Sequence, residues 1–315
     1  MKRAIPLLAL AWLGCSGEAS PTGFGEPIRV LEGVFKAGDL PGTPPVDGGT
    51  PAKPNVTAVN SANNILRPGQ ASKSLTGVVT DDASAVAVRF ADLGTGYWLV
   101  VPGAPDVSAP DALTWAMSFD VAADVPPGLH TLRFAAVDDK GVAGTQTDVL
   151  VCVDAPIPDN LNACDPSLAP PAAVLSLTWD AAVDLDLVVV LPSGQVVDAK
   201  HRSTAPITDA GVQPDPKKDG VIDRDSNGAC VIDGIRRENL VWQSEPTAGQ
   251  YLVYANLFSA CGQQAVRFTV TLYRAQQADG GSALVETSKQ SGELLAIDAN
   301  GGANNGLYVT SFSFP

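Results

Sequence analysis

The sequence predicts an all-β protein, in which two β-sandwich domains follow a signal peptide and a disordered tether. Short apolar or alternating runs recur along the chain, and turn residues separate them. Glycine and proline, at 30 and 25 of 315 residues, are frequent between the runs. No segment of the mature chain has apolar residues at helical spacing. Two packed sheets are the usual way for such strands to bury their apolar faces.

Residues 1–14 have the features of an export signal. The basic start MKR precedes the apolar run AIPLLALAWLG, which is too short to span a bilayer as a helix. The whole arrangement resembles a bacterial lipoprotein signal, although Trp12 stands where leucine is usual. That resemblance implies cleavage before Cys15, a lipid anchor on Cys15 and, because Ser16 follows, an outer-membrane location. The alternative is an ordinary secretion signal, with Cys15 incidental.

Residues 15–54 are expected to form a flexible tether. The stretch PGTPPVDGGTPAKP within it is rich in proline and glycine and has almost nothing to bury. A more apolar segment, IRVLEGVFKAG, is a candidate for a short docked strand. The tether would hold the folded part away from the bilayer.

Residues 55–155 are expected to form the first sandwich. The stretch PPGLHTLRFAAVDDKG resembles the last hairpin of bacterial immunoglobulin-like domains. In those domains a Pro-Gly turn starts a strand, and an Asp/Asn-x-Gly turn separates it from the final strand. The resemblance implies a fold and no activity. Alternating or continuous apolar residues predict strands at 74–82, 85–93, 96–103, 113–123, 128–139 and 147–153.

Residues 165–315 are expected to form the second sandwich, of the jelly-roll type. The runs that read as strands are 172–180, 184–192, 194–199, 239–244, 250–258, 266–275, 294–299 and 306–315. The two halves of the chain share their structural class but no internal repeat.

The second half also resembles a family of exported bacterial β-sandwich domains typified by YfaP. The matching stretches are LTWDAAVDLDLVVVLPSGQVV, DRDSNGACVIDGIRRENLVWQSEPTAGQYLVYANLFSACG and VRFTVTLY, about a third of the chain. The family pattern combines a TWD-x-DLDL strand, an acidic D-x-D loop, an EN-[IV]-x-W strand and a PPGTYTVYVN strand. The resemblance implies a fold and an exported setting, and no established catalytic activity.

Four cysteines remain if Cys15 carries lipid, and in an exported chain they imply two disulfides with three possible pairings. The local pairing, Cys152 with Cys164 and Cys230 with Cys261, is the simplest to propose. A zinc site is not favoured, because the sequence has no CxxC and both histidines are far from the cysteines.

The acidic stretch DRDSNGACVIDG resembles the first half of a calcium loop. Its alternating ligands would be Asp223, Asp225 and Asn227, followed by Gly228 for a turn with positive φ and by the carbonyl of the next residue. The twelfth position, where an EF-hand has a bidentate glutamate, is Gly234. The loop alone therefore supplies too few oxygens for calcium, and further ligands must come from elsewhere.

Asp184 and Asp186 are the first candidates, because alternate residues of a strand share one face. Glu238 follows the loop, and Asp233 is a further candidate. By the resemblance to the YfaP-like family, the DLDL, D-x-D and EN positions belong together, which implies one site of Asp184, Asp186, Asp223, Asp225 and Glu238. With Asn227 from the loop, these are the six expected calcium ligands. The competing interpretation is a plain Asx turn, with the strand aspartates solvated or paired with Arg236 or Arg237.

The net charge of −14 does not favour binding to nucleic acid or to an anionic lipid surface. No GxSxG, HExxH or phosphate-binding glycine loop is present, so a catalytic role is not expected. The expectation is a non-catalytic, lipid-anchored envelope protein with a structural, adhesive or ligand-binding role. The alternatives are a carbohydrate-binding module, with aromatic platforms drawn from Tyr97, Trp98, Trp115, Trp179, Trp242 and Tyr308, and a hydrolase that uses the acidic cluster.

Overall fold

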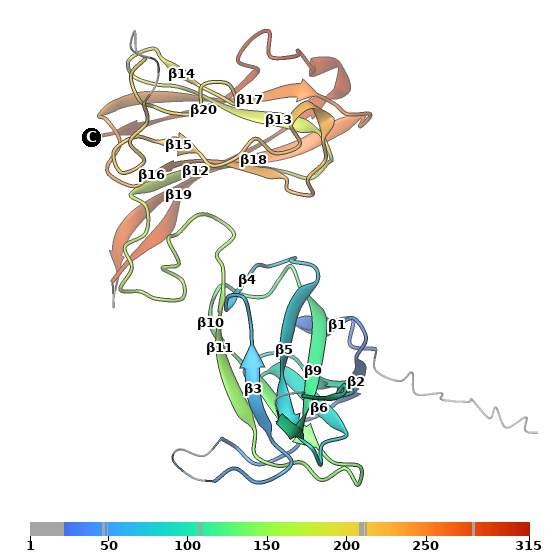
Figure 1. Ribbon diagram of the computed structural model, residues 1–315. Coiled ribbons are helices and arrows are strands. Elements are labelled where there is room, and N and C mark those ends of the chain that lie inside the picture. The colour runs from blue at the N-terminus through green and yellow to red at the C-terminus, as the bar shows by residue number, and fades with distance from the viewer. Residues whose placement is uncertain are drawn as a thin grey trace, which may run out of the picture. The chain divides into compact units, whose positions relative to one another are not determined.

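The computed structural model describes residues 22–45, 48, 50–106, 109–207, 211, 213–278 and 281–315 (Figure 1). The expected signal peptide and Cys15 lie outside these residues. The described chain is all-β, as predicted, and contains several antiparallel sheets. Its only helical segments are two single 3-10 turns, η1 (Gly228–Cys230) and η2 (Ala296–Asp298). No helix among the described residues is long and apolar enough to cross a membrane.

The chain forms two compact units. The described residues up to Ser61 belong to the first unit together with Ser72–Asp120 and Leu132–Val149. The second unit contains Ala62–Ala71, Val121–Thr131 and Leu150–Pro315.

The strands upstream of residue 155 form two sheets. One has the order β1 (Ile28–Val30), β9 (Ala109–Val121), β5 (Lys73–Thr80) and β3 (Val56–Asn60), with β8 (Pro105–Asp106) also paired to β9. The other has the order β2 (Val34–Ala37), β7 (Gly96–Val100), β6 (Ala85–Phe90), β10 (Gly128–Val137), β11 (Thr147–Val153) and β4 (Ile65–Leu66). The edge pair of β4 with β11 is parallel.

Alternating side chains from both upstream sheets are buried. Trp115 of β9 and Phe134 of β10 bring their rings to a centroid distance of 5.5 Å, and both are almost fully buried. Trp98 of β7 donates a hydrogen bond from its indole to the carbonyl of Ile28 in β1, at 2.8 Å. These contacts explain why tryptophans in the predicted strands serve packing.

The segment Ile28–Ala37, expected inside the tether, forms two edge strands. β1 joins the sheet of β9, and β2 pairs with β7 over Val34–Ala37. Ile28 and Val30 alternate inward and are buried, which is the gain that fixes them there. The folded part of the chain therefore begins well before residue 55.

The downstream strands also form two sheets. One has the order β15 (Val221–Ile222), β16 (Arg237–Trp242), β12 (Ala173–Trp179), β18 (Ala265–Ala278) and β19 (Gly281–Leu295). The other has the order β14 (Val196–Val197), β13 (Asp184–Val190), β17 (Gly249–Ser259) and β20 (Leu307–Phe314).

One hydrophobic core joins the two downstream sheets. It receives Leu175 and Leu177 from β12, and Leu185 and Leu187 from β13, all fully buried. Truncation of such a leucine to alanine costs about 2–5 kcal/mol. Because β13 turns Leu185 and Leu187 inward, its alternate residues Asp184 and Asp186 must lie on the other face of the sheet.

Two disulfides are present among the described residues. The upstream disulfide joins Cys152 to Cys164, and the loop disulfide joins Cys230 to Cys261. This is the local pairing that the sequence favours, and the loop disulfide ties the acidic loop to the residues that follow β17.

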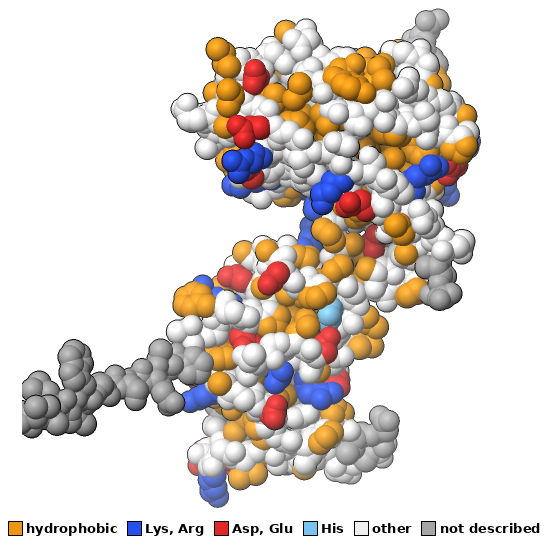
Figure 2. Space-filling model, turned by 180° about the vertical axis from the view of Figure 1, so that it is seen from behind, with side chains coloured by type: hydrophobic (Ala, Val, Ile, Leu, Met, Phe, Trp, Pro, Cys, Tyr) orange, Lys and Arg blue, Asp and Glu red, His pale blue; other side chains and the backbone are white. Residues whose placement is uncertain are grey.

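Charged side chains are sparse on the surface. On the face that Figure 2 shows, lysine and arginine are scattered among aspartate and glutamate, and no basic patch gathers there. This distribution agrees with the net charge of −14.

Candidate metal centre

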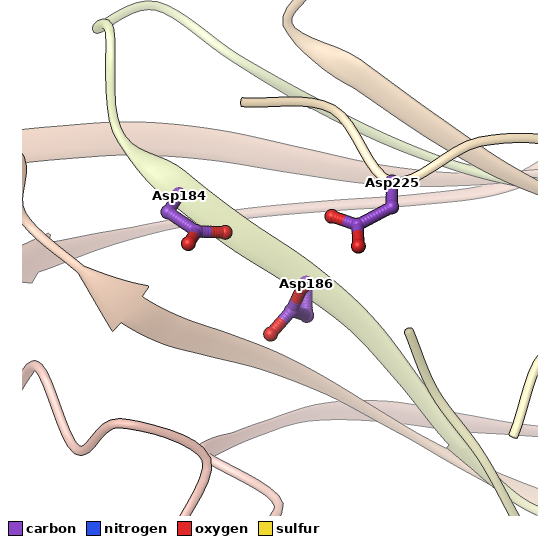
Figure 3. Close-up of side chains that lie close together, drawn as sticks. All are labelled: Asp184, Asp186 and Asp225. Carbon is purple, nitrogen blue, oxygen red and sulfur yellow. The ribbon is translucent and has the colours of Figure 1, made fainter. Parts of the chain in front are cut away.

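Three carboxylates converge on the outer face of the downstream sheet that contains β13. Asp184, Asp186 and Asp225 each place a carboxylate oxygen within 4.8 Å of the other two. Figure 3 shows Asp184 and Asp186 on the same strand, with Asp225 reaching toward them from the neighbouring loop. Asp184 and Asp186 are only 2% and 7% exposed, whereas Asp225 is exposed.

Buried side chains of the acidic loop hold Asp225 in place. Ser226, which follows it, donates its N–H to Glu238 at 3.1 Å and its hydroxyl to the carbonyl of Arg237 at 2.7 Å. Asn227 donates its amide to the carbonyl of Val183 at 3.0 Å. The loop is thus fastened to β16 and to the residue directly before Asp184.

The backbone of the loop differs from the expected calcium loop at Gly228. The positive φ angles occur at Asn227 (61°), Ala229 (51°) and Cys230 (62°), and Gly228 is not among the positive-φ residues. A Cβ at 228 would lie 2.7 Å from Oδ1 of Asp225, so a larger residue there would push that carboxylate aside. The expectation that Gly228 supplies the positive φ was therefore wrong; its neighbours adopt that strained conformation.

The N–H groups exposed by this turn face β13. Ala229 donates its N–H to Oδ2 of Asp184 at 2.8 Å. Burial raises the pKa of Asp184 to about 6, a rise that the hydrogen bond from Ala229 opposes and the charge of Asp225 adds to.

Asp186 has the fewest stabilising partners of the three carboxylates. No described residue donates a hydrogen bond to it, and none forms an ion pair with it. Burial, followed by the negative charges of Asp184 and Asp225, raises the pKa of Asp186 to about 7. Salt bridges from Arg236 or Arg237, the competing interpretation of these aspartates, do not occur among the described residues.

The other three predicted ligands lie outside this cluster. Asp223 accepts hydrogen bonds from the N–H and the side-chain amide of Asn239, at 2.9 and 2.8 Å, and so orients the start of β16. Asn227 is buried, and its Oδ1 accepts the N–H of Asp233 at 3.2 Å.

Glu238 is fully buried and also serves the backbone. Its carboxylate accepts the N–H groups of Leu187 at 2.8 Å and Ser226 at 3.1 Å. Burial raises the pKa of Glu238 well above its ordinary value, and the charge of Asp186 adds to the rise. Glu238 thus bridges β13 and the acidic loop beneath the cluster.

The cluster opens into a cavity of about 340 Å³ that no motif in the sequence indicates. Asn256 of β17 lies in register with Asp186 of β13, so both side chains share the outer face. The remaining polar lining includes Asp198, Lys200, Asn304 and Asn305, and Phe258 supplies a ring. The positions of Asn256 and Phe258 on β17 were accessible from the sequence, by the alternation of QYLVYANLF. Asp198, Lys200, Asn304 and Asn305 come from loops whose folding no local pattern predicts.

The donor set consists of oxygen atoms alone. Three carboxylates at this spacing repel one another, and a cation bound among them would reverse that repulsion. Carboxylate and carbonyl oxygens suit calcium, magnesium or manganese rather than zinc or copper. An acidic triad that could hold a metal ion is therefore present, as the sequence led us to expect.

Comparison with known proteins gives little guidance. No protein-family model matches the chain, and no curated protein matches it. Among solved structures, the chain is similar to the crystal structure of dimeric latent PorU from Porphyromonas gingivalis, at 14% identity and a TM-score of 0.20. The match covers 84% of this chain and 20% of PorU, so the chain spans about a fifth of the length of that protein.

Proposed function

We propose that this chain is a non-catalytic, lipid-anchored protein of the bacterial cell envelope whose acidic triad binds calcium. The observation that supports it is the carboxylate of Asp186, which belongs to a residue only 7% exposed, faces the cavity and has no hydrogen bond or ion pair among the described residues. A largely buried charge without a protein partner is costly, and a bound cation removes that cost. The proposal gives the cation a structural and ligand-presenting role.

Calcium is the cation that the donor set suits best. Asp184 and Asp186 are fixed on a strand, and Asp225 is fixed on a strained loop beside them. Calcium accepts such irregular arrangements of six to eight oxygens, whereas magnesium needs near-octahedral geometry and keeps most of its water. Weak affinity, in the class of about 10⁻⁴–10⁻³ M, is expected for an extracellular-type site.

A non-catalytic role is supported by the sequence, which has no GxSxG, HExxH or phosphate-binding glycine loop. Four of the five tryptophans lie among the described residues, and all four are buried, which gives them packing roles: Trp98, Trp115, Trp179 and Trp242.

The wider proposal concerns architecture and location. We assign the upstream sheets to an immunoglobulin-like sandwich and the downstream sheets to a YfaP-like sandwich, because each pair of sheets buries alternating apolar residues. Cleavage before Cys15 and lipid on its thiol would anchor the chain in the outer membrane. Several acyl chains make such an anchor stable, at about 0.8 kcal/mol for each buried methylene.

Calorimetric titration with calcium tests the site. The unsubstituted chain should bind one ion per chain, and Asp225→Asn should lower the affinity at least about tenfold. Asp233→Asn is the matched control, since Asp233 lies in the same loop but outside the triad. Absence of binding to the unsubstituted chain, or an equal loss in the control, would contradict the proposal.

Mass analysis of the mature N-terminus tests the anchor. A mature chain that begins at a diacylated or triacylated Cys15 supports it. An unmodified chain that begins at another residue rules it out.

A further inference from the structure

The cavity beside the triad is large enough for a ligand besides the cation. Its volume of about 340 Å³ falls in the range of small-molecule sites, about 300–1,000 Å³. Three loops border it, at 198–200, 225–229 and 302–305, and the outer face of β13 and β17 forms its base. The nine-tenths buried, unpartnered carboxylate of Asp186 faces this space.

A cation at the triad would have unfilled positions toward the cavity. Asp184 and Asp186 approach from the strand, and Asp225 approaches from one side. One oxygen of Asp184 already accepts the N–H of Ala229. Fewer than six carboxylate oxygens therefore remain available, while calcium takes six to eight ligands. The remaining positions are open to oxygens of water or of a bound molecule.

The charge around the cavity selects a neutral ligand. Four carboxylates line it, from the triad and Asp198, and Lys200 is the basic side chain among the lining residues. A divalent cation and one ammonium group leave this site with a net negative charge. An anionic ligand would be repelled, whereas a pair of adjacent hydroxyl groups could coordinate the cation without adding charge.

Other groups in the wall suit a polyhydroxylated molecule. The side chain of Asn305 has no hydrogen-bond partner among the described residues, so its amide can both donate and accept. Oδ1 of Asn304 accepts the N–H of Gly306 at 2.8 Å, and its NH₂ group has no acceptor among the described residues. Phe258 adds a half-buried ring, against which the C–H face of a sugar can pack.

From these observations we infer that the cavity binds a neutral sugar through two vicinal hydroxyl groups that complete the coordination of the cation. The inference rests on the proposed calcium site and gives it a ligand class. Asn305 and Asn304 hydrogen-bond other hydroxyl groups, and Phe258 contacts the apolar face of the ring.

The test measures retention of the full chain on immobilised neutral glycans, including mannan and galactan, with polygalacturonate as the acidic comparison. In calcium the chain should be retained on a neutral glycan, and a chelator should release it. Asn305→Ala should weaken retention about fivefold, the loss expected for one hydrogen bond. Its calcium affinity should stay within about twofold, because Asn305 is not in the triad.

The other possible results distinguish failure of the sugar-binding inference from failure of the calcium site. A chain that binds calcium in the calorimeter but is retained on no neutral glycan overturns this inference and leaves the calcium site intact. Retention that persists in chelator, or a preference for polygalacturonate, also overturns it. A chain that does not bind calcium at all refutes the proposed function itself.

Discussion

Replacement of Asp186 by asparagine should stabilise the metal-free chain. The carboxylate is 7% exposed and has no donor among the described residues, whereas an asparagine of similar size carries no charge. Its folded pKa of about 7, against the ordinary value of 3.8, means that ionisation above pH 7 disfavours the folded state. The difference corresponds to about 4 kcal/mol, which is the upper limit of the gain.

The same substitution should remove most of the stabilisation by calcium. At about 10 mM calcium, a site with an affinity of about 10⁻⁴–10⁻³ M stabilises the folded chain by about 1.4–2.7 kcal/mol. Asp186→Asn deletes a central ligand, so its free energy of unfolding should change little between chelator and calcium. In chelator the variant should have the larger free energy of unfolding. Calcium should therefore narrow this difference between the two chains, or reverse its sign.

Urea unfolding at a pH of about 8 measures both effects. Tryptophan fluorescence records both units, because Trp98 and Trp115 lie upstream and Trp179 and Trp242 lie downstream, so the unfolding transition that responds to calcium is the one assigned to the downstream unit. Asp233→Asn is again the control. The reasoning is refuted if Asp186→Asn unfolds at lower urea than the unsubstituted chain in chelator. An unchanged response to calcium would equally refute the role of Asp186 as a ligand.

Three further outcomes are expected. Without calcium, the contribution of Asp184 and Asp186 to stability should fall as pH rises from 3.8 through about 7, because the folded state retains protons that the unfolded state has released. Across this pH window, the urea midpoint should fall less steeply in Asp186→Asn than in the unsubstituted chain. Gly228→Ala should weaken calcium binding about tenfold, because the added Cβ would meet Asp225 at 2.7 Å, and a calorimetric affinity equal to that of Gly25→Ala would contradict this. Serine at both Cys230 and Cys261 should also weaken calcium binding, whereas loss of the upstream disulfide should not; equal titrations of the two double variants would show that the loop disulfide does not hold the site.

Most of the fold was predictable from the alternation of apolar and polar residues along the strands. The first four residues of DLDLVVV alternate, so burial of Leu185 and Leu187 fixes Asp184 and Asp186 on the opposite face. The class and the pairing of cysteines were predictable for similar local reasons. The strand IRV was harder to place, because three residues carry a weak pattern and its partner β9 lies far along the chain.

The candidate site was only half accessible from the sequence. The alternation in DRDSN made Asp225 a candidate ligand, and the resemblance to the YfaP-like family grouped it with Asp184 and Asp186. Neither could show that Asp223 turns to Asn239 instead. Glu238 was expected among the ligands because EN follows the loop, yet its carboxylate satisfies two backbone N–H groups. Such choices depend on tertiary hydrogen bonds, which spacing along the chain does not encode.

The connectivity of the disulfides bears on how the chain matures. Each bond joins a cysteine to the next one along the described chain, at separations of 12 and 31 residues. A chain that enters an oxidising compartment N-terminus first presents Cys152 and Cys164 before either later cysteine. Pairing in order of arrival then yields the native bonds directly. The order of translocation would then select one of the three possible pairings, and the native disulfides would form without slow rearrangement of wrong ones.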